Sequence, residues 1–585
     1  MYMKKWFLYN KKADFKAIAD KYGIDQVTAR ILRNRDINSD SQINQFLHGS
    51  LEEDLHSPLY LPDAIKCMNQ LNRAIAEKKH IRVVGDYDVD GVCATYILVR
   101  GLRRLGAQVD YVLPDRIRDG YGINVDIINK AKEDGVQVIL TCDNGIAAID
   151  ELKHARELGI TVLVTDHHDV RQNQDEDYGC ESRDILPPAS AVVDPKREDN
   201  RYPYPEICGA VVAWKIIIMM YQNHAIPEEE YYEFLEFAAI ATICDVMELK
   251  DENRTIVKFG LQQLKQTTNP GLRALLQVQE LLTQEHITSY HIGYIIGPCI
   301  NAGGRLRSAE IALDLFLTDD VSEAFDKAVR LKELNDSRKT MTIAATNQAI
   351  EMVEKYYMRD MVLVVYIPGL HESLAGIIAG RLRERFYKPS FVITRAEGDE
   401  AGEPLVKGSG RSIEGYSMSG HLQEVSDLLL KWGGHPMAAG FTLLERNVES
   451  FRAELNRRCT LGKEQLVDKL WIDVPMPIDY ISDNLIHDFE KLEPFGKGNE
   501  KPCFATKNLG IADCKVFGKN RNVVKMRLLS ESGCLMDGLI FTNGDEFLRE
   551  KGRNAKIDVV YYPQINEYNG NQSLQIIIDD YQLKP

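Results

Sequence analysis

The chain has 585 residues, of which 44% are hydrophobic and 27% charged, and its formal net charge is −16. Because a single core rarely grows beyond about 250 to 300 residues, this length predicts three or four globular domains. The acidic balance argues weakly against attraction of the whole surface to nucleic acid. The eleven cysteines contain no CxxC pair, which disfavours a zinc knuckle or a disulfide framework and fits a reducing, cytoplasmic location.

No segment predicts a secretion signal or a membrane anchor. The N-terminal stretch MYMKKWFLYNKKADF lacks a continuous apolar run. The most apolar stretch, residues 210–221, is too short to span a bilayer. We therefore expect a protein without a membrane-spanning segment.

Between residues 81 and 195, short β-branched runs alternate with helical patterns. The runs are IRVV (81–84), VDYVL (109–113), VQVILT (136–141), ITVLVT (160–165) and SAVV (190–193). Near-continuous apolar strands that alternate with helices indicate a parallel sheet covered on both faces. The fold class expected here is α/β, with a doubly wound parallel sheet.

The rest of the chain predicts three further parts. Residues 205–315 have mostly helical patterns, and residues 320–356 form a long amphipathic stretch without Pro or Gly, which predicts a helical connector. A second, smaller α/β domain follows, and from about residue 465 short alternating strands favour a small β-barrel of the OB type over a generic all-β module. The predicted boundaries are 1–319, 320–356, 357–460 and 461–585.

Acidic clusters follow three of the predicted strands. GDYDVDG comes after IRVV, CDNG after VQVILT, and DHH after ITVLVT. Open α/β sheets build their sites at the carboxyl ends of parallel strands, so these side chains should converge in one cleft. They are Asp86, Asp88, Asp90, Asp143, Asp166, His167 and His168. A calcium loop is disfavoured, because a strand precedes Asp86 and Ile97 stands where the closing Glu would be.

So many carboxylates in one cleft predict bound cations, because the charges would otherwise repel one another strongly. Carboxylate and imidazole ligands without thiolate suit manganese or magnesium. There are more carboxylates than one ion needs. This excess predicts two ions that share a bridging aspartate, an arrangement used in phosphoryl chemistry.

The motifs GDYDVDG, CDNGI, TDHH and AIATICDVMEL resemble those of the DHH phosphoesterases, and GGHPMAAGF resembles the signature of their associated C-terminal domain. Within that superfamily the chain resembles the RecJ subgroup of single-strand-specific DNA exonucleases over nearly its whole length. The resemblance implies metal ligands at Asp86, Asp88, Asp90, Asp143, Asp166, His167 and Asp245, with Asp143 as the bridge. It implies catalytic roles for Asp90, Asp143 and His168. It also implies phosphate contacts from Arg116, Arg305, His371, Ser409, Arg411 and His435. Which of the first three aspartates binds which ion is left open.

A basic segment in the predicted barrel is consistent with a nucleic-acid substrate. Residues 491–527 contain nine Lys or Arg and three acidic residues. Phe495, Phe504 and Phe517 lie in the same segment, so charge and stacking together could track a single strand. Aromatic residues of a barrel are, however, more often part of its core.

The leading hypothesis is an exonuclease that degrades single-stranded DNA from the 5′ end and releases mononucleotides. The polarity comes from the resemblance, which also suggests a single-strand-binding protein and a helicase as partners, and a cleft within one chain predicts a monomer. One alternative is a small-substrate phosphoesterase, which would need no terminal barrel. The other is a non-catalytic single-strand-binding scaffold. Such a protein should lack some of the acids of the four motifs, whereas this chain has all of them.

Overall fold

The computed structural model describes residues 4–173, 183–400, 402–462, 464–552, 555–568 and 571–584. They form two compact units. The central unit contains Leu55–Met247 and Glu252–Leu466, and the terminal unit contains Met1–Asp54, Glu248–Asp251 and Val467–Pro585. Ten cysteines are free, and the eleventh, Cys180, lies outside the described residues. Within the described ranges, no helix combines the length and the apolar character needed to cross a bilayer.

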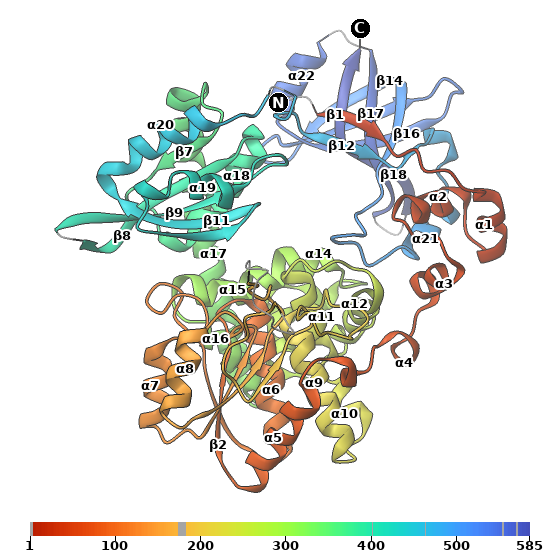
Figure 1. Cartoon of the computed structure of the whole chain (residues 1–585). Helices are drawn as coiled ribbons and strands as arrows, with labels where there is room; N and C mark the ends of the chain where they lie inside the picture. The colour runs from red at the N-terminus through yellow and green to blue at the C-terminus, as the bar shows by residue number, and fades with distance from the viewer. Residues whose placement is uncertain are drawn as a thin grey trace. The chain divides into compact units, whose positions relative to one another are not determined.

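A five-stranded parallel sheet organises the first domain of the central unit, in the order β3-β2-β4-β5-β6. Its strands are His80–Val84 (β2), Gln108–Val112 (β3), Val138–Cys142 (β4), Thr161–Thr165 (β5) and Ala191–Val193 (β6). Helices α7 (Val125–Glu133) and α8 (Ile149–Glu157) cover one face, and α6 (Val89–Arg104) and α9 (Gly209–Asn223) cover the other (Figure 1). The predicted doubly wound α/β domain is confirmed.

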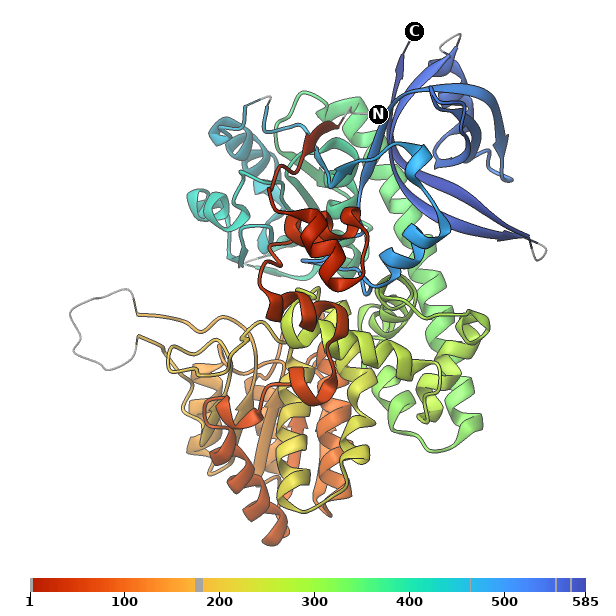
Figure 2. The ribbon, with the colours of Figure 1, turned by 90° about the vertical axis from the view of Figure 1, so that its right-hand side faces the viewer.

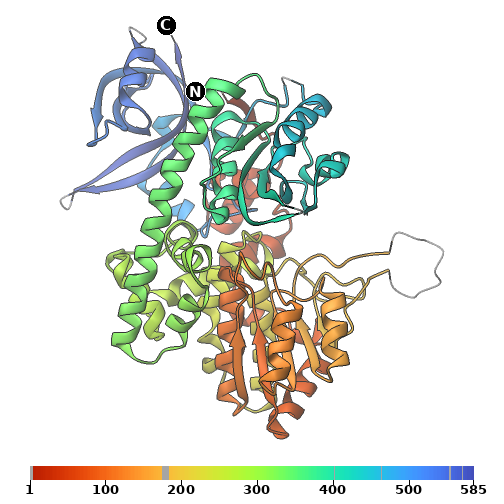
Figure 3. The ribbon, with the colours of Figure 1, turned by 90° about the vertical axis from the view of Figure 1, so that its left-hand side faces the viewer.

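Helices complete this domain and lead into a long connector. They are α5 (Ala64–Ala76), α10 (Glu228–Tyr232), α11 (Leu235–Cys244), α12 (Asp251–Leu264), α13 (Pro270–Val278), α14 (Ser289–His291), α15 (Gly297–Leu306) and α16 (Glu310–Leu317). The connector is α17 (Val321–Met352), whose first turn is capped by Asp320. It packs against α13, α15, α16 and α18 (Ala375–Phe386), and Figure 3 shows it as one continuous helix. The long helix expected over 320–356 is present.

The second sheet belongs to the smaller domain and has the order β10-β11-β9-β8-β7. Its strands are Leu363–Tyr366 (β7), Ser390–Glu400 (β8), Glu403–Arg411 (β9), Lys431–His435 (β10) and Ala438–Leu444 (β11). Only β7 and β8 pair in parallel. Helix α18 packs on one face, and α19 (Met418–Glu424) and α20 (Val448–Arg458) contribute to the core on the other. The second α/β domain is therefore also as expected.

Five strands of the terminal unit close into a barrel. They are Phe504–Phe517 (β14), Val523–Leu529 (β15), Leu535–Phe541 (β16), Lys556–Tyr568 (β17) and Asn571–Lys584 (β18). The sheet runs β14-β15-β16-β18-β17, and β17 pairs again with β14. Closure removes the unpaired strand edges, as in OB folds. The elements β13 (Val474–Pro475), α21 (Asp483–Glu490) and α22 (Gly544–Lys551) complete this part.

The first 54 residues join the terminal unit, whereas the predicted division placed them with the first domain. Strand β1 (Lys5–Leu8) pairs in parallel with β12 (Lys469–Ile472). Helices α1 (Phe15–Tyr22), α2 (Gln26–Asn34) and α3 (Asp40–His48) lie beside α21 (Figures 1 and 2), and α4 (Leu51–Asp54) follows them. Ile31 and Phe46 share a core with Phe489 and Phe504. These contacts join distant parts of the sequence, so no local pattern predicts them.

Candidate active site

The loop after β2 places three carboxylates in one tight turn. Asp88 caps α6, and its Oδ1 accepts a hydrogen bond from the N–H of Gly91 at 3.1 Å. Gly91 allows the turn to close, because a Cβ at this position would lie 2.5 Å from the backbone oxygen of Asp86. Asp86 and Asp90 are 1% and 2% exposed. The loop therefore directs these two carboxylates into the interior at the end of β2.

The start of α9 orients the carboxylate of Asp90. Its two oxygens accept hydrogen bonds from the N–H groups of Gly209 and Ala210, both at 2.7 Å. These N–H groups belong to the first turn of a helix, which favours a negative charge. The carboxylate of Asp90 is therefore held in a fixed orientation.

The loop after β4 supplies Asp143 and ties two strand ends together. Asp143 has a positive φ of 59°. The side-chain amide of Asn144 donates to the carbonyl oxygens of Val84 at 3.0 Å and Cys142 at 2.9 Å. A Cβ on Gly209 would lie 2.8 Å from the Cβ of Asp143, so glycine leaves the space that this aspartate needs. Asn144 lies inside the CDNG motif, but sequence reasoning gave it no role.

His167, which follows β5, lies between carboxylates from three other elements. Its Nε2 is 3.1 Å from Oδ1 of Asp143, 3.4 Å from Oδ2 of Asp90 and 3.8 Å from Oδ2 of Asp245. Asp245 ends α11, and its side chain is 30% exposed. The four segments that carry the sequence motifs thus meet at one imidazole.

The convergent side chains form three overlapping groups, each with donor atoms that lie within 4.8 Å of one another. The groups are Asp86, Asp88 and Asp143; Asp90, His167 and Asp245; and Asp143, His167 and His168. Asp143 and His167 each belong to two groups. Shared donors of this kind suit two neighbouring cations.

The electrostatics of this cluster favour a bound cation. Burial, followed by the charges of Asp90, Asp88, Asp86 and Asp245, raises the pKa of Asp143 well above its usual value. Burial and Asp88 do the same to the pKa of Asp86, whose Oδ2 is buried without a hydrogen-bond partner among the described residues. A divalent ion would supply both a partner and the missing positive charge. Carboxylate and imidazole donors fit magnesium or manganese.

Asp166 belongs to none of these three groups, although it was predicted as a ligand. Its Oδ1 lies 2.7 Å from Nδ1 of His168, and its Oδ2 accepts from the N–H of Ile146 at 2.9 Å. Burial alone would raise the pKa of Asp166, but the hydrogen bond and charge of His168, the charge of His167 and the N–H of Ile146 together outweigh it and lower that pKa. Burial alone would likewise lower the pKa of His168, yet Asp166 raises it to about 9. In this geometry Asp166 orients His168.

Two residues near the site escaped the sequence analysis. The hydroxyl of Tyr121 donates to the backbone oxygen of Asp143 at 2.6 Å and lies 3.2 Å from Nδ1 of His168. Asp194 directly follows β6 and is fully buried; burial and the charge of Asp166 raise its pKa to about 8. The carboxyl-end rule that found the other acids applies equally to Asp194 in the stretch VVDP. Tyr121 carried no such signal.

An arginine-rich cavity of about 650 Å³ lies in the same unit. Arg116, Arg305, Ser409 and Arg411, four of the six predicted phosphate-binding residues, line it together with Arg381 and Arg383. The guanidinium of Arg116 lies 3.8 Å from the ring centroid of Tyr87. Burial, and then the nearby Arg116, lower the pKa of Arg305 to about 10. Crowded guanidinium groups in a hollow suit a phosphate ligand.

The other two predicted phosphate-binding residues do not line this cavity. Nδ1 of His371 lies 2.8 Å from Oγ of Ser373, which is part of the cavity wall. His435 ends β10 and is exposed. The structure thus brings His371 to the margin of the cavity and leaves His435 outside its wall.

The barrel segment 491–527 offers fewer free aromatic and basic side chains for strand binding than its sequence suggests. Phe504 is fully buried in the core, Phe495 is partly buried against it, and Phe517 is 48% exposed. Several of its basic residues pair with acids from other positions in the terminal unit. These pairs are Lys491 with Asp488, Lys515 with Asp513, Arg521 with Asp545, and Lys525 with Asp537. Phe504 therefore cannot stack on a base.

Three family models match the chain. They are the N-terminal domain of the DHH family over residues 80–242, the DHHA1 domain over 359–460 and the RecJ OB domain over 472–580. These ranges correspond to the parallel-sheet domain, the second α/β domain and the barrel.

Curated relatives match along almost the whole chain. The single-stranded-DNA-specific exonuclease RecJ of Bacillus subtilis is 34% identical over 98% of this chain and 70% of its own length. That of Escherichia coli is 31% identical over 94% of this chain and 95% of its own length. The crystal structure of RecJ in complex with Mn²⁺ from Thermus thermophilus superposes with a TM-score of 0.82 at 26% identity, over 99% of this chain and 80% of that one. The chain therefore belongs to the RecJ family of single-stranded-DNA-specific exonucleases.

Proposed function

We propose that this chain hydrolyses the phosphodiester bonds of single-stranded DNA from the 5′ end and releases 5′-mononucleotides. The observation that carries the proposal is the set of three donor groups joined through Asp143 and His167. The substrate and the polarity follow from the family. The closed OB-type barrel supports a long strand rather than a small molecule as the substrate.

Two divalent cations, manganese or magnesium, fit the donor groups. Asp86, Asp88 and Asp143 would hold one ion, and Asp90, His167 and Asp245 would hold the other. Asp143 would bridge them, because its Oδ1 lies 3.1 Å from Nε2 of His167 in the second set. When bound, such ions neutralise charge on the scissile phosphate and lower the pKa of the attacking water.

The protein side chains around these ligands bind and orient the substrate. His168 is 42% exposed at its side chain and is oriented by Asp166, so its imidazole would contact the scissile phosphate. Arg116, Arg305 and Arg411 would bind phosphate oxygens in the arginine-rich cavity through paired N–H groups. Catalysis would then depend on positioning and on charge stabilisation.

Cleavage of end-labelled DNA tests this proposal. The wild-type chain should shorten a single strand from its 5′ end with Mn²⁺ or Mg²⁺, and should act much more slowly on blunt duplex and on a dinucleotide. Asp143→Ala should lower kcat/KM by more than about a hundredfold, since even residues that only support metal ligands are worth about 10- to 100-fold. Asp326→Ala, which removes an exposed acid on α17, is the matched control and should stay at the wild-type rate.

Two results would contradict the proposal. Equal rates on a dinucleotide and a long strand would favour a small-substrate phosphoesterase. Full activity of Asp143→Ala would show that Asp143 is not the ligand shared by two metal ions. A single-strand-binding protein or a helicase as partner, and the monomeric state, stay predictions. Co-purification and sedimentation of the full chain would test them.

A further inference from the structure

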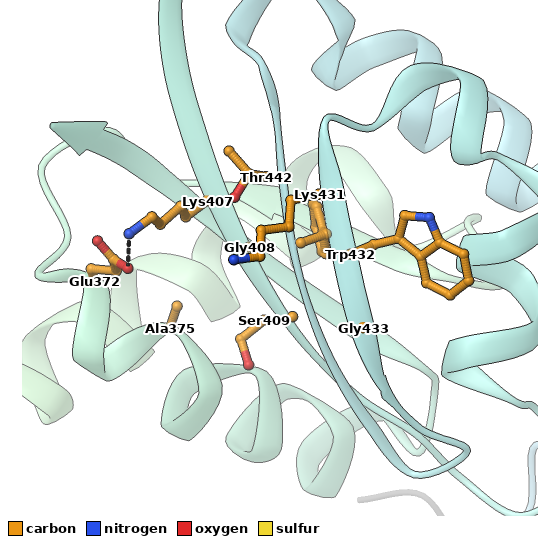
Figure 4. Close-up of a pocket in the computed structure, with 11 residues that line it drawn as sticks. Glu372, Ala375, Lys407, Gly408, Ser409, Lys431, Trp432, Gly433 and Thr442 are labelled. Atoms are coloured by element: carbon orange, nitrogen blue, oxygen red, sulfur yellow. Dashed lines mark hydrogen bonds and ion pairs between the residues drawn. The ribbon is translucent and has the colours of Figure 1, made fainter. Parts of the chain in front are cut away.

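A second pocket, of about 390 Å³, lies in the smaller α/β domain on the α18 side of its sheet. Figure 4 shows Lys407, Lys431 and Thr442 around it, with Glu372 joined to Lys407. We call it the lysine pocket and define it by these four residues. It adjoins the arginine-rich cavity, because Glu372 and Ser409 line both.

The strand register arranges this pocket in two rows. Lys407 on β9 pairs with Thr442 on β11, which pairs with Lys431 on β10. Paired residues of neighbouring strands point to the same face of a sheet, so a hydroxyl lies between two ammonium groups. In the next row on that face, Ser409 pairs with Gly440, which pairs with Gly433. The pocket thus has a cationic side and a floor in which Gly433 and Gly440 carry no side chain.

The two floor glycines are not required by packing among the described residues. A Cβ on Gly433 would meet nothing within 4 Å, and one on Gly440 would meet only the backbone oxygen of Gly408, at 3.8 Å. Neither is among the glycines with positive φ. Since neither sterics nor backbone conformation demands glycine here, the missing side chains leave room for a ligand against the sheet.

One of the two lysines of this pocket, Lys407, already forms an ion pair with a carboxylate of the protein. Oε1 of Glu372 lies 2.7 Å from Nζ of Lys407, and the two side chains are 26% and 36% exposed. Ion pairs this exposed contribute little net free energy, so the contact is easily exchanged for another anion. Lys431 is exposed, and the ion pairs of the described residues include none for it.

The lysine pocket continues the path of a strand that leaves the arginine-rich cavity. Lys407 and Arg411 lie on the same face of β9, with Ser409 between them. Each two-residue step along a strand is about 6.6 Å, which is the scale of one nucleotide of an extended chain. A strand with one phosphate at Ser409 and Arg411 would therefore bring its next phosphate to Lys407.

We propose that Glu372 is an internal competitor of the DNA backbone. A strand phosphate binds Lys407 and Lys431 next to the phosphate held by Arg411, and it displaces the Glu372 carboxylate from Lys407 as it enters. Competition from Glu372 limits the affinity of this pocket for the strand. The strand therefore dissociates from the pocket quickly and can advance by one nucleotide. This inference rests on the proposed function, since it assumes a single-stranded DNA substrate.

Binding of a fluorescent twenty-nucleotide oligothymidylate to the full chain tests the exchange. EDTA prevents cleavage, and anisotropy is measured over a series of salt concentrations. Glu372→Gln should tighten binding about three- to tenfold at low salt. The slope of log K against log salt should stay close to that of the wild type, because Lys407 contacts the same strand phosphate in both proteins. Glu403→Gln is the control. It neutralises a carboxylate at the start of β9 that pairs with Arg446 and does not line the pocket.

Lys407 provides the decisive double-mutant comparison. Lys407→Ala should weaken binding about threefold and should abolish the gain from Glu372→Gln, while Lys431→Ala should weaken binding and leave that gain in place. If Lys407→Ala does not fold by circular dichroism, Lys407→Gln replaces it. The inference is overturned if Glu372→Gln behaves like Glu403→Gln, or if its gain persists without Lys407. A wild-type chain that does not bind the oligonucleotide would overturn the proposed function as well.

Discussion

Nδ1 of His168 lies 2.7 Å from Oδ1 of Asp166, and the other oxygen of this buried carboxylate is engaged by the backbone N–H of Ile146. The contact fixes the direction of an imidazole that stands partly exposed beside the metal ligands. It gives Asp166 an orienting contact with His168, and the role of Asp166 as a metal ligand stays a prediction.

Replacing Asp166 with Asn should separate orientation from metal binding. The amide keeps the shape but weakens the contact with His168, so we expect kcat to fall about 10- to 100-fold while the Mn²⁺ affinity stays within about threefold of wild type. Single-turnover cleavage and calorimetric Mn²⁺ titration measure the two quantities. Asp143→Ala should lose Mn²⁺ binding in the same titration. A loss of equal size in Asp166→Asn would restore Asp166 to the ligand set.

Gly209 should tolerate no side chain. A Cβ there would lie 2.8 Å from the Cβ of Asp143, at the turn that also orients Asp90. We expect Gly209→Ala to cost about 1 to 3 kcal/mol of unfolding free energy and at least tenfold in cleavage rate. Gly293→Ala is the matched control, because its Cβ would meet only Ile243 at 3.7 Å. Urea denaturation and cleavage assays compare them, and equal behaviour of the two variants would argue against a steric role for Gly209.

Mn²⁺ should stabilise the folded chain, and EDTA should reverse the effect. The ion binds the native cluster of acids and relieves their repulsion, so at about 100 times its Kd it should add about 2.7 kcal/mol. Thermal unfolding with and without Mn²⁺ measures this shift. Asp143→Ala should show little of it, although it should unfold at a higher temperature than wild type in EDTA, because one buried like charge is gone. An equal Mn²⁺ shift in both proteins would place the ion elsewhere.

Glu236 should make the first domain less stable as pH rises. It is 2% exposed, its Oε1 accepts from the hydroxyl of Thr267 at 2.7 Å, and its Oε2 has no partner among the described residues. Burial raises its pKa from 4.5 to about 8. The unfolded chain therefore loses this proton near pH 4.5 while the folded chain keeps it to about pH 8, so stability falls across that window.

Glu236→Gln should remove this pH dependence. Near pH 4.5 the variant and the wild type should unfold at similar urea concentrations, and at pH 8 the variant should be more stable by about 2 to 4 kcal/mol. The exposed Glu229→Gln is the control and should change neither value by more than about 0.5 kcal/mol. If the unfolding free energies of the variant and the wild type differ by the same amount at every pH from 4.5 to 8, Glu236 ionises normally.

The sequence predicted those parts of the fold that local patterns determine. Apolar runs such as ITVLVT identify strands of a covered sheet, and the acids that follow them must meet at its carboxyl edge. The contact of Asp166 with His168 was not predictable, because neighbours in a motif do not reveal which side chains face a ligand and which face each other. Phe504 was ambiguous for a similar reason, since alternation in a barrel strand does not say which face is inward. Arg381 and Arg383 lie on an ordinary helical pattern, and only the packing of α18 brings them to the cavity.

The pairing of β1 with β12 also has a consequence for how the chain is made. The first 54 residues leave the ribosome early, but their partners in the terminal unit are synthesised roughly 400 residues later. At about 5 to 20 residues per second, this delay is about 20 to 80 s. During that time Ile31 and Phe46 lack their eventual core, while the central unit can already fold. The nascent N-terminal segment should therefore be the part of this protein that most needs a chaperone.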